Sequence, residues 1–90
     1  MSKKEWSFYI AHCKDNSFYV GIATDVYKRI KEHNKGLGAI FTKRKRPIKL
    51  VYFEKYPDQV SARKREIQVK NWSRIKKEKL ISGFPQLRSG

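Results

Sequence analysis

The sequence predicts a small α+β domain in which a three-stranded antiparallel sheet is flanked by helices, in the order β-β-α-β-α-α. Three observations favour this fold class. Near the N-terminus, apolar residues alternate with others at the two-residue period of strands. Further along, helix-capping residues precede segments with helical apolar spacing. Between those segments, the run IKLVYF is almost entirely apolar, as in a well-covered strand.

The length of 90 residues is enough for one domain with a modest hydrophobic core. We expect residues 1–83 to form this domain and residues 84–90 to be a flexible tail. No segment is long and apolar enough to span a membrane, and MSKKEWSFY lacks the apolar run of a signal peptide. Cys13 is the single cysteine, which rules out an internal disulfide. We therefore expect a cytoplasmic location.

The first two strands are predicted to form a hairpin. Two apolar triplets mark half-buried strands, namely Trp6, Phe8 and Ile10 in the first and Phe18, Val20 and Ile22 in the second. The segment CKDNS between them is rich in turn-forming residues. If both triplets face one side, Tyr9 and Tyr19 must both point to the other, which suits a loop of three or five residues. Two phenols are then carried to one face of the sheet.

The next segment, TDVYKRIKEHNKG, has the start and stop signals of a helix. Thr24 or Asp25 can cap its N-terminus, and Gly36 can end it in a left-handed conformation. Arg29 and His33 are four residues apart, so they lie together along the edge of the inward arc. That arc is expected to hold Val26, Tyr27 and Ile30.

The third strand is predicted over residues 48–53. A second helix is expected to begin at Asp58 or Ser61 and to run to about Trp72. A short third helix is expected over residues 73–83.

A single acidic residue stands out within the second of these helices. Glu66 shares a stripe with Ala62 and Val69, whereas Val60 and Ile67 define a second apolar stripe. The pattern leaves open which stripe faces inward. If Glu66 faces inward, it needs a cation from the protein or a bound metal ion, because an unpaired buried charge is costly.

The chain is strongly basic, with 22 Lys and Arg against 8 Asp and Glu, a net charge of +14. Such an excess indicates an anionic partner, for which nucleic acid is favoured over a membrane, since no long amphipathic helix or lipid signal is present. DNA rather than RNA is the expected partner. The cations predicted to bind phosphates are Lys28, Lys43, Arg44, Lys45, Arg46, Lys70, Arg74, Lys76 and Lys77.

Phosphodiester hydrolysis needs a group that activates water, a cation on the scissile phosphate and often a divalent metal. Five residues could supply these parts from one face of the sheet and two helices: Tyr9, Tyr19, Arg29, His33 and Glu66. The planar fork of an arginine donates two hydrogen bonds to a phosphate at once. A glutamate offers hard oxygen ligands that suit Mg²⁺ with several waters retained.

The same residues carry a resemblance to the GIY-YIG endonuclease domain, and nearly the whole chain takes part in it. The two tripeptides that name the family correspond to residues 8–10, FYI, and residues 19–21, YVG. The family's helical arginine and following histidine match Arg29 and His33, and its glutamate matches Glu66. The small standalone bacterial members are the most similar overall.

The resemblance implies a metal-dependent endonuclease acting on DNA, including structured or damaged DNA. It implies that Glu66 holds one Mg²⁺ or Mn²⁺ ion and that Arg29 stabilises the scissile phosphate. It further implies that Tyr19 helps to activate or orient water, which as a base requires a lowered pKa of its phenol. Tyr9 and His33 are expected to position the phosphate and relay protons.

The chain also departs from the family pattern, which leaves alternatives open. Ser7 and Phe8 precede Tyr9 where the first motif has its glycine, although Gly21 is kept, as a bulge or as a site of close packing. Many family members have an asparagine well after the glutamate, whereas here Asn71 is only five residues past Glu66, and Glu78 stands where a more distant asparagine is expected. One alternative is a non-catalytic nucleic-acid-binding module on the same fold. Another is an RNA- or ribosome-associated basic protein.

Overall fold

The structure, a computed structural model, describes residues 4–37 and 43–83. Its sheet has the strand order β2-β1-β3 and is antiparallel throughout. The strands are β1 (Trp6–His12), β2 (Phe18–Ala23) and β3 (Lys49–Tyr56), and the helices are α1 (Val26–Asn34), α3 (Gln59–Lys70) and α4 (Arg74–Ser82). The predicted fold class and the order β-β-α-β-α-α are confirmed. The expected tail over residues 84–90 lies outside the described residues. None of the helices in the described part is long and apolar enough to cross a membrane.

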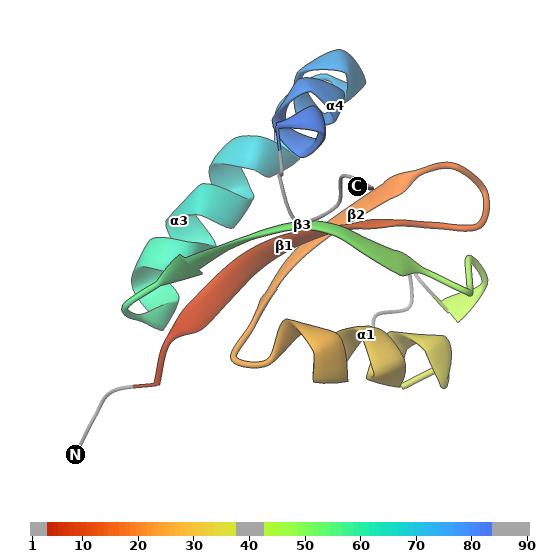
Figure 1. Ribbon diagram of the computed structural model, residues 1–90, viewed down its shortest axis with the longest axis horizontal. Coiled ribbons are helices and arrows are strands. Elements are labelled where there is room, and N and C mark those ends of the chain that lie inside the picture. The colour runs from red at the N-terminus through yellow and green to blue at the C-terminus, as the bar shows by residue number, and fades with distance from the viewer. Residues whose placement is uncertain (1–3, 38–42, 84–90) are drawn as a thin grey trace.

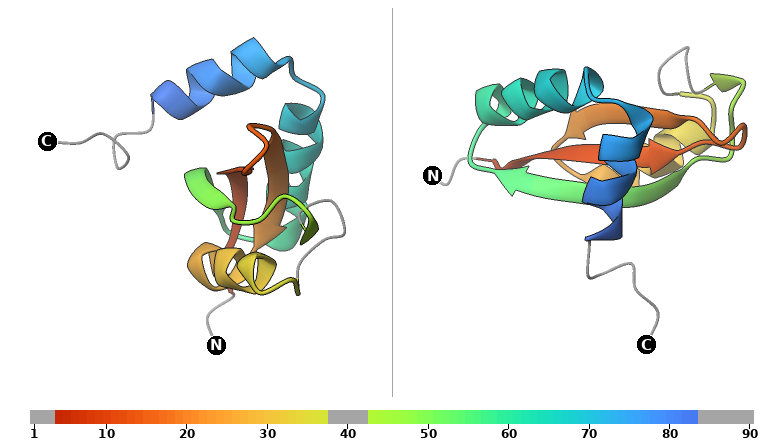
Figure 2. Two further views of the ribbon diagram at one scale, coloured as in Figure 1. Left: turned by 90° about the vertical axis from the view of Figure 1, so that its right-hand side faces the viewer. Right: turned by 90° about the horizontal axis from the view of Figure 1, so that it is seen from above.

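The sheet lies between two layers of helix (Figure 1, Figure 2). Helix α1 covers one face, where Tyr9 and Ala11 of β1 pack with Val26 of α1. Helices α3 and α4 lie on the opposite side, where Phe8 and Ile10 of β1 share a second core cluster with other buried side chains. The prediction of a half-buried first strand is wrong, because β1 is the central strand and both of its faces are covered.

The hairpin between β1 and β2 has the predicted parity. Tyr9 pairs with Gly21 and Ala11 pairs with Tyr19, and the connecting loop is the five residues 13–17. Because alternate residues of a strand face the same side, this register places Tyr9 and Tyr19 on one face. That face is the one covered by α1.

Strand β3 contains an irregularity that explains its almost continuous apolar sequence. Its pairing with β1 shifts between Ile10 and Ala11, so that Val51 is an extra residue opposite this step. Because of the shift, Leu50 and Phe53 both pack into the cluster on the α1 side. The run IKLVYF therefore does not alternate strictly.

The helix caps follow the sequence prediction. The Asp25 carboxylate accepts a hydrogen bond from the Lys28 amide at 3.1 Å, and that of Asp58 accepts from the Ser61 amide at 2.8 Å. Gly36, just after α1, has a φ of +84°, the left-handed conformation expected there. Ser73 caps α4.

One residue of the predicted inward arc of α1 is misplaced. Tyr27 is 60% exposed, whereas Val26 is buried. The Tyr27 ring packs edge-on against Phe53 of β3 at a centroid distance of 6.1 Å. On the same helix His33 is completely buried, so the inward arc holds Val26 and His33 and leaves Tyr27 at its exposed edge.

Helix α3 turns one of its two apolar stripes to the sheet. Ala62 and Val69 are fully buried, whereas Val60 and Ile67 are 64% and 55% exposed. The stripe shared by Ala62, Glu66 and Val69 is therefore the inward one, which resolves the ambiguity left by the sequence.

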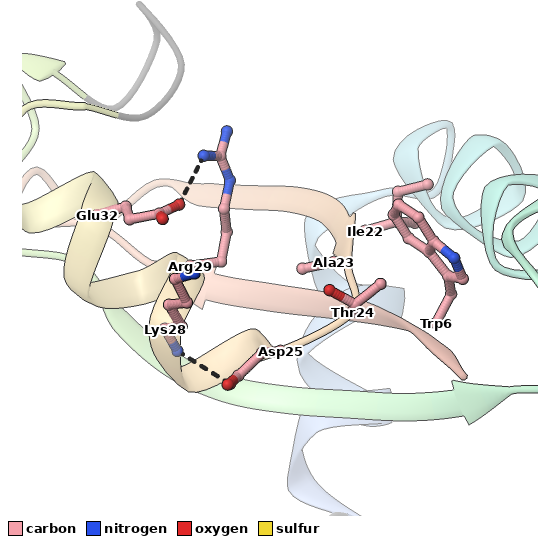
Figure 3. A pocket seen from close by; sticks show the side chains of 8 residues that line it. All are labelled: Trp6, Ile22, Ala23, Thr24, Asp25, Lys28, Arg29 and Glu32. Carbon is pink, nitrogen blue, oxygen red and sulfur yellow. Dashed lines mark hydrogen bonds and ion pairs between the residues drawn. The ribbon is translucent and has the colours of Figure 1, made fainter. Parts of the chain in front are cut away.

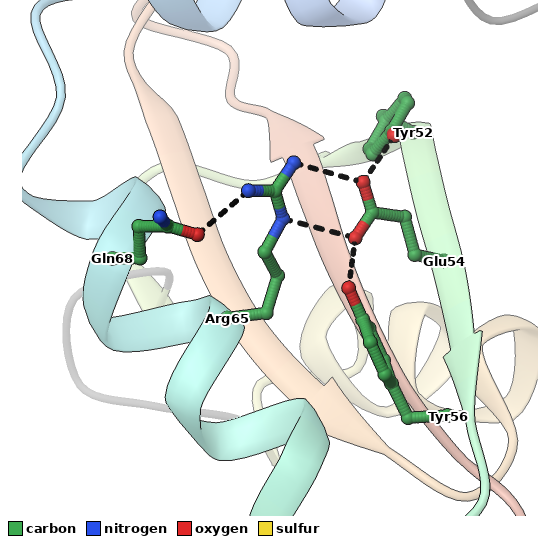
Figure 4. A network of polar contacts seen from close by, with 5 residues as sticks. All are labelled: Tyr52, Glu54, Tyr56, Arg65 and Gln68. Carbon is green, nitrogen blue, oxygen red and sulfur yellow. Dashed lines mark hydrogen bonds and ion pairs between the residues drawn. The ribbon is translucent and has the colours of Figure 1, made fainter.

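A polar network anchors α3 to β3 (Figure 4). The Arg65 guanidinium donates to both carboxylate oxygens of Glu54, at 3.0 and 3.2 Å. The hydroxyls of Tyr52 and Tyr56 donate to the same carboxylate. Burial by itself would raise the pKa of Glu54, but the hydrogen bonds from Arg65 and the two tyrosines outweigh it and lower that pKa. Arg65, which directly precedes Glu66 in the chain, thus connects α3 to β3.

Candidate active site

Two buried side chains form the inner part of the site. The Tyr9 hydroxyl lies 3.0 Å from Nε2 of His33, and both side chains are almost completely buried. Burial, followed by the positive charge of Arg29, lowers the pKa of His33, and burial raises the pKa of Tyr9. The imidazole is therefore neutral and the phenol protonated near pH 7, and the two groups share a hydrogen bond.

The second phenol lies beside this pair. The ring centre of Tyr19 is 6.2 Å from that of Tyr9 and 5.1 Å from that of His33. Gly21 makes the approach possible, because a Cβ there would lie 2.9 Å from the Tyr9 hydroxyl and 3.1 Å from Cε2 of Tyr19. Of the two roles left open for Gly21, close packing is the observed one.

Arg29 reaches the phenols from α1. Its Nη1 donates to Oε1 of Glu32 at 3.1 Å, and its charge and a hydrogen bond act on the Tyr9 phenol to lower its pKa against the larger effect of burial. Arg29 also lines a pocket of about 310 Å³ (Figure 3). The guanidinium is only partly buried, which leaves it open to an anion.

Glu66 approaches from the other layer of helices. Its side chain is 13% exposed and accepts a hydrogen bond from Arg63 at 3.1 Å. It lines a pocket of about 210 Å³, together with Phe18, Tyr19, Val20, Lys70 and Lys77. Since α1 and α3 cover opposite faces, Glu66 meets Tyr19 at the free edge of β2. The sequence predicts that the five site residues come from one face of the sheet and two helices, and α3, the helix that carries Glu66, lies on the opposite face from α1.

The electrostatics at Tyr19 differ from those that a basic phenol needs. Burial raises its pKa, the Arg29 charge opposes this, and the Glu66 charge adds to it. In the protein by itself, the pKa of Tyr19 is raised. A hydroxyl that keeps its proton can orient a water molecule by hydrogen bonding, whereas a general base would need the opposite shift.

The nine cations predicted to bind phosphate fall into separate places. Lys70 and Lys77 line the Glu66 pocket, and the Arg74 guanidinium lies 4.4 Å above the ring of Phe18, which lines the same pocket. Lys28 lines the Arg29 pocket. A third pocket is lined by Lys43, Arg44 and Arg46, while Lys45 pairs with Asp15 and Lys76 lies over Trp72.

The residues around Glu66 fit a divalent ion of a particular kind. Within residues 4–37 and 43–83, no group of three His, Cys, Asp or Glu side chains could hold a metal ion. Glu66 therefore offers one carboxylate, with the Tyr19 phenol nearby. Mg²⁺ is commonly held by one or two carboxylates and completed by water and substrate phosphates. This donor set matches that pattern rather than a closed all-protein site.

Three neighbours of the site were not singled out from the sequence. Glu32 follows Arg29 by one helical turn, a spacing that indicates an ion pair. Phe18 was assigned to the core, yet it also borders the Glu66 pocket. Trp6 lines the Arg29 pocket, and only the tertiary structure brings the two together. Asn71, by contrast, ends α3, where its amide donates to the Ile67 carbonyl.

Comparison with known proteins agrees with this arrangement. Residues 5–79 match the model of the GIY-YIG catalytic domain. The chain belongs to the GIY-YIG family. Membership supports a nuclease-like role for the domain and implies that it binds nucleic acid. GIY-YIG nucleases generally use a divalent metal, which agrees with the single-carboxylate donor set at Glu66.

Individual relatives cover most of this GIY-YIG chain. A UPF0213 protein of Staphylococcus saprophyticus is 53% identical over 74 residues, which span 82% of this chain and 90% of the relative. A UPF0213 protein of Staphylococcus aureus is 48% identical over 73 residues, or 81% and 89% of the two chains. Both relatives are small proteins of nearly the same extent.

Two solved structures share the GIY-YIG fold. The solution structure of a UPF0213 protein from Bacillus halodurans has a TM-score of 0.56 and 44% identity, covering 87% of this chain and 83% of that one. The solution structure of a protein from E. faecalis has a TM-score of 0.61 and 34% identity, covering 99% of this chain and 95% of that one. The likeness to the small standalone bacterial members is thus confirmed.

Proposed function

We propose that this GIY-YIG domain is a metal-dependent endonuclease that hydrolyses phosphodiester bonds of DNA, including structured or damaged DNA. The observation that carries the proposal is the convergence at the edge of β2 of a cation, a carboxylate and two phenols. Arg29 comes from α1, Glu66 from α3, and Tyr9 and Tyr19 from the hairpin. Together they offer phosphate binding, metal binding and proton handling within one region.

Arg29 binds and stabilises the scissile phosphate in this proposal. Its guanidinium presents several donors in a plane and is partly exposed. In the absence of substrate, Glu32 occupies one of these donors. An incoming phosphate therefore competes with Glu32 for Arg29. Lys70 and Lys77 lie beside Glu66 and would bind neighbouring phosphates.

Glu66 would hold Mg²⁺ or Mn²⁺, and the bound ion would supply polarisation of a phosphoryl oxygen. The hydroxyl of Tyr19 orients the attacking water through a hydrogen bond, a role that agrees with its raised pKa. Tyr9 and His33 form a route for a proton, because Tyr9 can pass its own proton to Nε2 as it accepts another. Gly21 keeps the space in which both phenols meet.

A cleavage assay with matched variants tests the proposal. Wild type, Glu66→Gln and Glu78→Gln are compared on supercoiled, single-stranded and branched DNA, with Mg²⁺, Mn²⁺ or EDTA. Glu78 is the control, since it is an exposed glutamate that also pairs with an arginine, Arg74. We expect cleavage by wild type and Glu78→Gln with metal only, and loss of cleavage with retained binding for Glu66→Gln. Cleavage that persists in EDTA or in Glu66→Gln contradicts the proposal.

A second candidate is a non-catalytic nucleic-acid-binding module. The observation that favours it is Asn71, which lies at the end of α3, where its side-chain amide donates to the Ile67 carbonyl. Under this candidate, neither wild type nor Glu66→Gln cleaves any substrate, and both bind with the same dependence on salt. Because both candidates bind nucleic acid, cleavage rather than affinity separates them.

A further inference from the structure

The two tryptophans of the chain have different surroundings. The ring of Trp72 is covered by cations, with the Arg65 guanidinium carbon 5.0 Å and the Lys76 ammonium 4.2 Å from its centre. Trp6, at the start of β1, is partly exposed. Among the described residues, no cation and no other aromatic ring lies against its indole. Within the part of the chain that the structure describes, Trp6 therefore presents an indole face that neither a cation nor another ring covers.

This open indole borders the pocket of about 310 Å³ that also contains Arg29. In Figure 3, Trp6 and Ile22 stand at one end of the pocket, and Arg29 and Glu32 stand at the other. The volume is at the small end of the range of about 300–1,000 Å³ that is typical of ligand pockets. Because Trp6 pairs with Tyr56 and lies with Ile22 on the α3 side of the sheet, the pocket passes around the end of β2, with the indole at one end and Arg29 at the other. It suits one planar ring system lying on the indole, with the adjoining group held by Arg29 at the far end.

The charge of this pocket differs from that of its neighbours. Its two carboxylates, Asp25 and Glu32, balance its two cations, Lys28 and Arg29. The third pocket is lined by the cations Lys43, Arg44 and Arg46 and by no carboxylate. The third pocket therefore attracts phosphates along its whole lining, whereas in the balanced pocket Arg29 can hold a phosphate at one end and the carboxylate acceptors suit a neutral ring that carries N–H donors.

We propose that this pocket binds a single unstacked nucleobase, which lies on Trp6 and belongs to the nucleotide next to the phosphate bound by Arg29. The inference rests on the proposed function, because it takes nucleic acid as the ligand. A base that enters the pocket has left the stack of a duplex, as in a single strand or a flipped nucleotide. The site therefore selects substrates in which a base next to the scissile phosphate is already free or is easily freed.

A fluorescence titration tests this site without relying on cleavage. The variant Trp72→Phe leaves Trp6 as the single tryptophan, since the chain has two. It is titrated in EDTA with a short single-stranded oligonucleotide, and with a chain of deoxyribose phosphates of the same length that has no bases. Binding is measured in parallel by competition with a labelled oligonucleotide. We expect the oligonucleotide to quench Trp6 and the abasic chain to bind without quenching it.

Substitutions of Trp6 give a second readout. Trp6→Leu removes the ring but keeps apolar bulk, and it is expected to weaken oligonucleotide binding about 5- to 160-fold, the range spanned by base–aromatic stacking. The same substitution should leave binding of the abasic chain unchanged. Trp6→Phe keeps a smaller ring, so its affinity for the oligonucleotide should lie between those of the wild type and Trp6→Leu. Circular dichroism spectra of the variants confirm that they are folded.

The outcomes separate this inference from the proposed function. Oligonucleotide binding with no change in Trp6 fluorescence, or equal quenching by the abasic chain, overturns the base site and leaves the nuclease proposal standing. If the oligonucleotide quenches Trp6 and the abasic chain does not, but the wild type cleaves none of the DNA substrates, the base site is supported and the nuclease proposal is overturned. Absence of oligonucleotide binding overturns the base site, and absence of binding to the supercoiled and branched DNA of the cleavage assay as well overturns both proposals.

Discussion

The Tyr9 hydroxyl and Nε2 of His33 lie 3.0 Å apart inside the protein and join the central strand to α1. The two residues are 24 positions apart in the chain, and neither side chain is accessible to solvent to more than 1%. The same contact therefore serves the stability of the fold and the chemistry of the candidate site.

Tyr9→Phe is predicted to destabilise the protein. The substitution leaves Nε2 of His33 buried without the phenol, and such a loss costs about 1–3 kcal/mol. Urea unfolding of the wild type and the variant measures the difference. Tyr27→Phe is the matched control, because Tyr27 is 60% exposed and its loss of a hydroxyl should change stability little. Equal effects of the two substitutions would show that the buried contact is not special.

Stability is predicted to decrease as the pH falls from 7.5 to 5.5. Burial and the Arg29 charge lower the pKa of His33 in the folded state, whereas the unfolded chain has the ordinary value of about 6.5. Below that value the unfolded state binds a proton that the folded state does not, so unfolding becomes easier. The loss is about 1 kcal/mol for each pH unit within the window between the two pKa values.

Urea unfolding at several pH values tests the role of His33. His33→Gln should remove most of the decrease between pH 7.5 and 5.5, whatever its effect on stability at high pH. His12→Gln is the control, because His12 is the second histidine of the chain and hydrogen bonds to Asn16 near the surface. A decrease that survives in His33→Gln but disappears in His12→Gln would contradict the assignment.

Gly21→Ala is predicted to disturb both the fold and the site. The new Cβ would lie 2.9 Å from the Tyr9 hydroxyl, and Tyr9 is too buried to move away freely. Overpacking of this kind costs about 1–3 kcal/mol. Gly83→Ala is the control, since a Cβ there meets its nearest atom at an ordinary 3.6 Å. The midpoint temperature of thermal unfolding and the rate of DNA cleavage should both fall for Gly21→Ala. Neither should fall for Gly83→Ala.

Arg65→Lys is predicted to cost more stability than Arg74→Lys. Arg65 donates two hydrogen bonds to Glu54 in a partly buried network, and a lysine cannot reproduce that fork. We expect a loss of about 2 kcal/mol, within the range for hydrogen bonds to charged groups. Arg74 pairs with Glu78 on the surface, where ion pairs contribute less than about 1 kcal/mol. Similar losses in urea unfolding would indicate that the Glu54 network does not anchor α3.

The salt dependence of DNA binding is predicted to identify the phosphate-binding surface. Replacing both Lys70 and Lys77 by glutamine should lower the slope of log K against log salt by about 1.4–1.8, the amount expected for two phosphate contacts. The control replaces Lys49 and Lys55, which lie on β3, the opposite edge strand of the sheet. An equal change in slope for both pairs would place the DNA elsewhere or spread it over both edges.

The local elements follow from the sequence by itself. Alternation of apolar residues and a five-residue turn determine that Tyr9 and Tyr19 share a face, because side chains of a strand alternate strictly. Asp25, Asp58 and Ser73 mark helix starts, because their short side chains accept bonds from free amide groups of the first turn. The family tripeptides and Arg29 are likewise visible in the sequence.

The tertiary structure decided how these elements meet. Ala62 and Val60 begin two equally apolar stripes, and only packing against the sheet selects the stripe that carries Glu66. That choice places Glu66 at the edge of β2, beside Tyr19. The two residues meet there even though α3, which carries Glu66, and α1 cover opposite faces of the sheet. Among the described residues, cations lie over the ring of Trp72 and not over that of Trp6, a difference that the sequence does not reveal. Such contacts join residues far apart in the chain. Local periodicity therefore cannot determine them, whereas the packing of the whole core can.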